Sequence, residues 1–175
     1  IDDEFAECHA VLGMVYNLLG ELDDAEDELE QALDIAEDND NYDALSMIYN
    51  NMGIYYKEQK RFEKSIKFFN KGVKLQKTLP NDYMKAHLLH NMSGCYGLMG
   101  DLDKRLIYLE QSQDIYEKLD DNISLGNSYG EMGNAYKSTS NNEKSIKYYD
   151  KAKQIFISEE MNYALAQLLI LQSEI

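Results

Sequence analysis

The chain has 175 residues, of which 44% are hydrophobic, enough to bury a substantial core. Its formal net charge of −15 disfavours nucleic acid and anionic membranes as main partners, because both are themselves negatively charged. The hydrophobic residues are spread without any run of 18 or more, so no transmembrane helix is expected.

Pairs of helices are predicted along the whole chain. Apolar residues recur three and four positions apart, and short breaks rich in Gly, Asn, Ser and Asp separate the periodic segments. Asn and Asp in these breaks are suited to cap the helix that follows. Helices are predicted at residues 4–19, 22–38, 42–59, 62–78, 82–99, 102–118, 122–138, 142–158 and 161–175.

The segment EKSIKFFNK at residues 63–71 returns as EKSIKYYDK at residues 143–151, 80 residues later. The underlying period is 40 residues, and several columns follow it. Small residues occupy one column: Gly13, Gly53, Ser93 and Gly133. Tyrosines occupy the next: Tyr16, Tyr56, Tyr96 and Tyr136. A column in the second helix is small except at its third member: Ala25, Ser65, Arg105 and Ser145.

These columns resemble the tetratricopeptide repeat, whose pattern is W-x2-L-G-x2-Y…A-x3-F. The resemblance implies an all-α, right-handed superhelical solenoid of antiparallel helix hairpins with about nine helices. A single array is expected over residues 1–175, with units near 2–41, 42–81, 82–121 and 122–160. Residues 161–175 would be a partial fifth unit or a capping helix. Because the chain lacks an initiator Met and ends on an apolar run, we expect a fragment of a longer protein.

In such a stack the first helix of each unit lines the concave surface, which is the expected binding site. Asparagine recurs on that surface, and its side chain offers both a donor and an acceptor to a peptide backbone. Three glycines (Gly94, Gly97 and Gly130) would leave the floor open to a ligand. Alternatively, asparagine only solvates the helices and glycine only eases packing. The candidate peptide-binding residues are Asn17, Asn50, Asn51, Lys57, His87, His90, Asn91, Asn127, Asn134 and Lys137.

Charge is distributed unevenly along the chain. Residues 1–45 hold 16 Asp or Glu and no Lys or Arg, whereas residues 57–77 hold eight Lys or Arg and two Glu. The basic residues Lys64, Lys67, Lys71 and Lys74 share one helix face. Such stripes are typical of a solvated convex surface with weak ion pairs. Alternatively, the acidic first unit docks on a basic surface of another chain.

No catalytic or metal-binding motif is found. His87 and His90 could meet a metal with a third ligand, but H-E-x-x-H, C-x-x-C and a phosphate-binding loop are absent. Cys8 and Cys95 are too few and too far apart for a disulfide framework, and indicate free thiols in a reducing, cytoplasmic compartment. The sequence therefore predicts a protein that is not an enzyme and needs no cofactor or metal.

Three functions remain open. The first is an interaction module whose concave groove binds a protein or peptide partner. The second is a regulatory or sensory input domain of a larger bacterial signalling protein whose effector domain lies outside this chain. The third is a scaffold that self-associates, giving a homo-oligomer through its terminal helices. None of them involves nucleic acid or a membrane.

Overall fold

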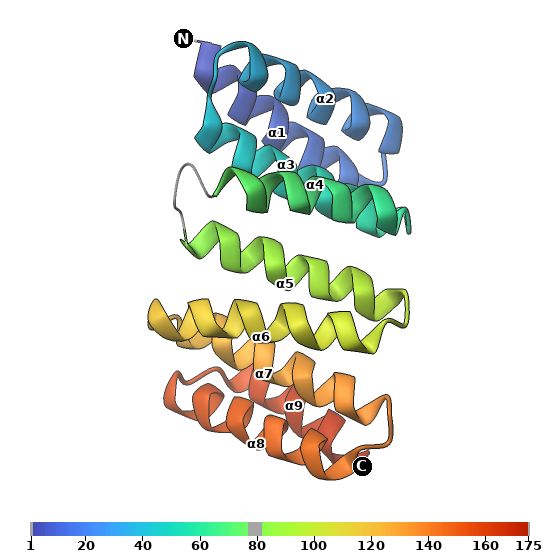
Figure 1. Ribbon diagram of the computed structural model, residues 1–175, viewed down its shortest axis with the longest axis vertical. Coiled ribbons are helices and arrows are strands. Elements are labelled where there is room, and N and C mark those ends of the chain that lie inside the picture. The colour runs from blue at the N-terminus through green and yellow to red at the C-terminus, as the bar shows by residue number, and fades with distance from the viewer. Residues whose placement is uncertain (1, 77–81, 175) are drawn as a thin grey trace. The chain divides into compact units, whose positions relative to one another are not determined.

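Residues 2–76 and 82–174 are described by a computed structural model, in which they form nine α-helices and no strand. Figure 1 shows consecutive helices running back and forth, as the repeat pattern predicts. The predicted all-α fold of helix hairpins is therefore confirmed. The helices are α1 (Asp2–Leu19), α2 (Leu22–Asp38), α3 (Tyr42–Glu58), α4 (Phe62–Leu75), α5 (Asp82–Leu98), α6 (Leu102–Lys118), α7 (Asn122–Lys137), α8 (Asn142–Ser158) and α9 (Asn162–Ser173).

The helix ends lie within a few residues of the predicted ones. The largest difference is at α4, which ends at Leu75 rather than at residue 78; residues 77 and 78 lie outside the described part of the chain. None of the described helices is long and apolar enough to cross a membrane.

The turns repeat every 20 residues, at half the sequence period. In each described turn one residue has positive φ, including Gly20, Asp40, Lys60 and Gly100. This left-handed residue ends the helix. The backbone N–H of the residue after it donates a hydrogen bond to a carbonyl of the last helical turn, as Asn41 N–H does to the carbonyl of Ala36.

Side-chain caps begin several of the helices. Asn41 and Asp121 accept hydrogen bonds from the backbone amides of Ala44 and Ser124, in the turns between predicted units. The asparagine and aspartate of these turns therefore do cap the following helices, as predicted.

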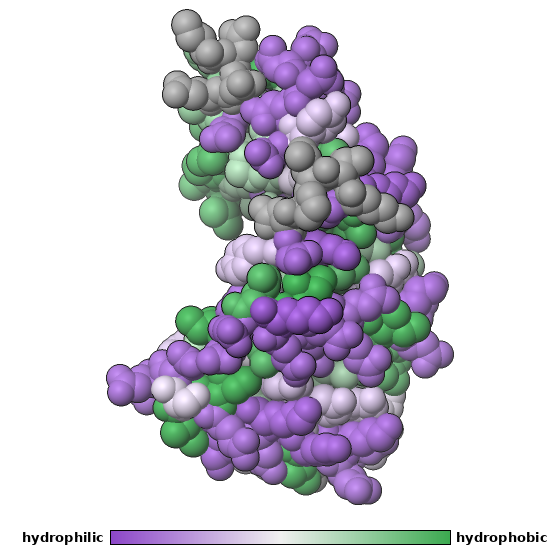
Figure 2. All heavy atoms as spheres, turned by 60° about the vertical axis from the view of Figure 1, so that its left-hand side comes forward, coloured by the Kyte–Doolittle hydropathy of each residue, from purple (hydrophilic) through white to green (hydrophobic). Residues whose placement is uncertain are grey.

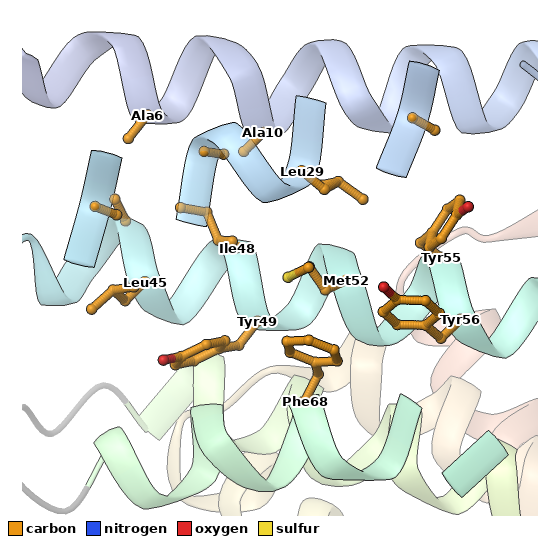
Figure 3. Close-up of a cluster of buried hydrophobic side chains, with 14 residues drawn as sticks. Ala6, Ala10, Leu29, Leu45, Ile48, Tyr49, Met52, Tyr55, Tyr56 and Phe68 are labelled. Carbon is orange, nitrogen blue, oxygen red and sulfur yellow. The ribbon is translucent and has the colours of Figure 1, made fainter. Parts of the chain in front are cut away.

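The chain divides into two compact units, residues 1–95 and 96–175. In the first unit α1 packs on α2, α3 on α4, and α3 also contacts both α1 and α2. Figure 3 shows Ala6 and Ala10 of α1 pointing toward α3, above Leu45 and Ile48. In the second unit α7 packs on α6 and α8, and α8 packs on α9. Within each unit, most of these contacts are between helices that are consecutive in the chain.

Glycine lets the two helices of a hairpin approach closely. A Cβ on Gly53 would overlap the ring of Phe69, and a Cβ on Gly133 would overlap the ring of Tyr149. We refer to each of these close contacts as a glycine notch. A hydrogen bond crosses both notches: Ser65 Oγ donates to the carbonyl of Gly53 at 2.6 Å, and Ser145 Oγ donates to the carbonyl of Gly133 at 2.9 Å. The small columns of the sequence therefore mark where the helices meet.

Aromatic pairs also repeat within the hairpins. In three hairpins the column tyrosine stacks on an aromatic ring 12 residues later, with ring centroids 5.3–5.5 Å apart. A lysine lies over each of these tyrosines. The sets are Tyr56, Phe68 and Lys64; Tyr96, Tyr108 and Lys104; and Tyr136, Tyr148 and Lys144.

The basic stripe of α4 is therefore only partly a solvated face. Lys67 and Lys74 are exposed, whereas Lys64 and Lys71 cover tyrosine rings. Each such contact contributes about 0.5–1 kcal/mol where it is exposed to water. Figure 2 shows a largely hydrophilic face in which hydrophobic residues form patches between polar ones.

Tyrosine hydroxyls join one hairpin to the next. Tyr49 donates to Glu37 at 3.3 Å and Tyr129 donates to Glu117 at 2.9 Å, so the same contact recurs two periods apart. Burial raises the pKa of Tyr129 to about 12, with a further contribution from the hydrogen bond to Glu117. The phenol is therefore neutral and able to donate at physiological pH.

The glycine notch gives a direct test of hairpin packing. Gly53→Ala should lower the free energy of unfolding by about 1–3 kcal/mol, because the added methyl displaces the Phe69 ring from a filled space. Urea unfolding followed by circular dichroism measures the change.

Gly94→Ala is the matched control, since a Cβ there meets no atom within 4 Å. Gly94 lies within α5, so alanine should leave stability unchanged or raise it by up to about 1 kcal/mol. Equal destabilisation by both variants would contradict the proposed role of the notch.

Candidate functional site

In the first unit, four of the predicted asparagines take part in three hydrogen bonds between neighbouring first helices. Asn51 Nδ2 donates to the carbonyl of Ala10 at 3.5 Å, Asn91 Nδ2 donates to Asn50 Oδ1 at 2.9 Å, and Asn17 Nδ2 donates to the carboxylate of Glu58. Each bond spans 41 residues, one repeat plus one position. These amides therefore help to align consecutive hairpins.

The same amides keep part of their hydrogen-bonding capacity. A side-chain amide carries two donor hydrogens and an acceptor oxygen, and each bond described above uses only one of these. Asn50, Asn51 and Asn91 are half-buried, so solvent still reaches them. Asn17 is only 7% exposed, which makes it a structural residue rather than a surface for a ligand.

The remaining predicted residues of this unit lie on α3 and α5. Lys57 is half-buried near the end of α3. Burial of Cys95 raises the pKa of its thiol, and the positive charge of Lys57 acts in the opposite direction. His87 packs edge-on against Tyr83, with ring centroids 4.5 Å apart. The backbone carbonyl of His90 accepts a hydrogen bond from Ser93 Oγ.

The second unit contains a small pocket between α7, α8 and α9, with a volume of about 130 Å³. Two predicted residues, Asn127 and Asn134, line it together with Gly130 and Glu131, all from α7. Phe156 of α8 and four residues of α9 complete the lining. The α9 residues are Ala164, Gln167, Leu168 and Leu171. The pocket thus combines amide groups with an apolar floor.

Asn134 is held in one orientation by a core tyrosine. Tyr149 OH donates to Asn134 Oδ1 at 2.7 Å, so the amide oxygen is already used as an acceptor. Burial raises the pKa of Tyr149, which keeps its hydroxyl protonated and able to donate. The NH2 end of Asn134 is therefore the end suited to meet a ligand, as a donor.

The charged groups near the pocket are paired. Arg105 Nη2 donates to Glu131 Oε2 at 2.5 Å. Arg105 occupies a column that is otherwise small, and Gly97 makes room for it, because a Cβ there would lie 3.0 Å from Arg105 Cδ. Lys137 does not line the pocket. It donates to the carbonyl of Leu171 at 2.9 Å and to Glu174 at 2.8 Å, and so fastens α7 to the end of α9.

The α9 side of the pocket was missing from the predicted site. The 40-residue period could have predicted these residues. Gln167 lies 40 residues after Asn127, and Leu171 lies 40 residues after Glu131. Leu168 is only 3% exposed, although it belongs to a terminal helix that could self-associate, and it lines the pocket. Leu169 and Ile170, in contrast, are exposed.

Among residues 2–76 and 82–174, no three His, Cys, Asp or Glu side chains gather in a way that could hold a metal ion. The two cysteines are free thiols, with Cys8 exposed and Cys95 buried.

The amide contacts between hairpins predict unequal effects of alanine substitution. Asn91→Ala should destabilise the fold by about 0.5–1.5 kcal/mol, because it removes the bond to Asn50. Asn127→Ala, at an exposed position of α7, should change stability by less than about 0.5 kcal/mol. Chemical denaturation of both variants tests this difference, and equal stability of the two would refute the structural role of Asn91.

Several solved structures share this fold at low sequence identity. A STAND protein with a tetratricopeptide repeat sensor from Pyrococcus horikoshii is 18% identical over 99% of this chain, with a TM-score of 0.90. Aspartyl phosphate phosphatase F from Bacillus subtilis is 17% identical over 99% of the chain, with a TM-score of 0.92. A Rap protein in complex with competence and sporulation factor is 18% identical over 96%, with a TM-score of 0.87.

The chain spans only part of these proteins: 27% of the STAND protein, 45% of the phosphatase and 47% of the Rap protein. Identities this low show a shared fold and nothing more specific. No curated protein matches the chain significantly.

Family membership rests on a sequence model. The tetratricopeptide repeat model matches residues 6–78 and 82–172, which is nearly the entire chain. Together with the helix hairpins, their glycine notches and their 40-residue period, this match shows that the chain belongs to the tetratricopeptide repeat family.

Proposed function

We propose that this chain is an interaction module that binds an extended peptide segment of a partner protein, anchored at the pocket between α7, α8 and α9. The observation that carries the proposal is the lining of that pocket. Asn127, Asn134 and Gln167 provide amide groups at its rim, and Phe156 and Leu168 provide an apolar floor. Amides can pair with a peptide backbone, while the floor can accept an apolar side chain.

The size of the pocket favours a peptide over a free small molecule. Sites for drug-sized ligands usually enclose roughly 300–1,000 Å³. A volume of about 130 Å³ is well below that range. It suits one amino-acid side chain, with the rest of the ligand lying along the surface.

The electrostatics favour hydrogen bonding over charge pairing. Glu131 is already paired with Arg105, and Lys137 with Glu174, so the charges beside the pocket are largely neutralised. The donor end of Asn134 and the exposed amides of Asn127 and Gln167 then carry recognition. Among proteins with this fold, one Rap protein is described in complex with competence and sporulation factor, which is consistent with ligand binding by such repeats.

A peptide-array screen of the purified chain tests the proposal, alongside the double variant Asn127→Ala, Gln167→Ala. Both side chains are exposed, so their removal should leave the fold intact. Peptides that bind the natural chain should bind this variant at least about tenfold more weakly, because two rim hydrogen bonds are lost.

The matched control is Asn142→Ala, Gln154→Ala, which removes two exposed amides that do not line the pocket. It should bind the same peptides with unchanged affinity. If no peptide binds the natural chain, or if both double variants lose affinity equally, the pocket is not the anchoring site.

A second candidate is a sensory input domain of a larger signalling protein. It is favoured by one observation: a STAND protein described as having a tetratricopeptide repeat sensor shares the fold, and the chain spans 27% of it. In that case a peptide bound by this chain should alter hydrogen exchange in regions of the natural polypeptide outside these 175 residues. If peptide binding changes hydrogen exchange only within the repeats, this candidate is wrong and the chain acts as a binding module alone.

A further inference from the structure

The first helix carries an apolar face that is left open. Phe5, Leu12 and Val15 of α1 are 54%, 38% and 44% exposed, and Cys8 is exposed among them. We refer to these four residues as the α1 face. An open hollow of about 660 Å³ lies along it, lined by Glu7, Cys8, Val11, Leu12 and Val15. Contiguous exposed apolar surface of this kind usually marks an interaction site.

The repeat itself shows what such a face contacts. Forty residues later, the equivalent residues of α3 are buried: Leu45 is 6% exposed, Ile48 0%, Met52 2% and Tyr55 3%. Helix α3 packs on α1 and α2 as well as on its own partner α4. A preceding hairpin thus covers this face wherever one is present in the same unit.

The positions at 40-residue steps from Cys8, which we refer to as the Cys8 column, show this burial most clearly. The later members of the column are Ile48, Leu88, Ser128 and Leu168, and each is at most 3% exposed. For one of them the contacting position is also known. A Cβ on Gly72 of α4 would lie 2.8 Å from Leu88, so the small column of a second helix meets this column of the next first helix. Cys8 is the one member of the column that lies open to solvent.

The charge of the first hairpin argues against a second copy on the same face. Residues 1–45 carry 16 acidic and no basic side chains. A two-fold contact between two α1 faces would bring these acidic hairpins together, and like charges across an interface are unfavourable. A preceding hairpin, in contrast, has its own sequence and need not be acidic.

We propose that the α1 face is the docking surface for another helix hairpin of the same repeat, supplied by the segment of the same polypeptide that precedes Ile1. On this proposal α1 is an internal helix of the array, and its apolar columns are buried as they are in α3. The proposal concerns array architecture and is independent of what the pocket of the second unit binds.

Cys8 offers a built-in probe of this contact. The reaction of its thiol with a maleimide, read by mass spectrometry of the labelled peptide, should be fast in the 175-residue chain and at least about tenfold slower in the natural full-length polypeptide. Analytical ultracentrifugation should show the 175-residue chain as a monomer. Cys95, which is buried, provides an internal reference for global opening.

An in-register extension tests the surface directly. In this variant a copy of residues 122–161, the α7–α8 hairpin, is placed immediately before residue 2, which preserves the 40-residue period. The second helix of the copied hairpin carries four lysines and would lie beside the acidic first hairpin. This extension should also slow the labelling of Cys8 at least about tenfold. The same extension with Ala152→Arg in the copied hairpin should restore fast labelling. Ala152 is the repeat equivalent of Gly72, which faces Leu88 of the Cys8 column, so an arginine there would prevent the copied hairpin from packing on Cys8.

Two results would overturn the proposal. One is that Cys8 reacts as fast in the full-length polypeptide and in the extension as in the 175-residue chain, while circular dichroism shows the added hairpin to be helical. The other is that the 175-residue chain self-associates with Cys8 protected, which would make a second copy the occupant.

Discussion

Close approach of two helices at a position without a side chain is the contact on which this structure depends. Gly53 and Gly133 provide that position, and the rings of Phe69 and Tyr149 fill it. The consequences extend beyond packing. Because Tyr149 lies against Gly133, its hydroxyl reaches the next residue of α7 and donates a hydrogen bond to Asn134 Oδ1. A core contact thereby fixes the donor end of a residue that lines the candidate site.

The inner asparagines serve different purposes in the two units. In the first unit Asn51 and Asn91 bond to the neighbouring first helix, so much of their capacity is used in aligning hairpins. In the second unit Asn127 is exposed beside a pocket, and α9 contributes Gln167 opposite it. The same residue type on the first helix of a hairpin is therefore structural in one unit and suited to binding in the other.

Nearest-neighbour packing explains both the stability of the hairpins and the open face of α1. Each repeat contacts only the repeats beside it, so a column that is buried in one hairpin depends on the hairpin before it. Ile48 and Leu88 are buried for this reason, whereas Cys8 is exposed. The stacked rings and their covering lysines, in contrast, lie within single hairpins and recur regardless of neighbours.

The sequence by itself determined the helices, their pairing and the phase of each face, because a 40-residue period repeats the same turns and the same glycine notch. It also indicated Asn127 and Asn134 as inward-facing residues. Only the tertiary structure decided that Asn91 bonds to Asn50, that Arg105 reaches Glu131 and that Leu168 packs beside a pocket. These contacts depend on the offset between adjacent hairpins, which is set by how their side chains interlock, as at Gly72 and Leu88, and no single repeat encodes that offset.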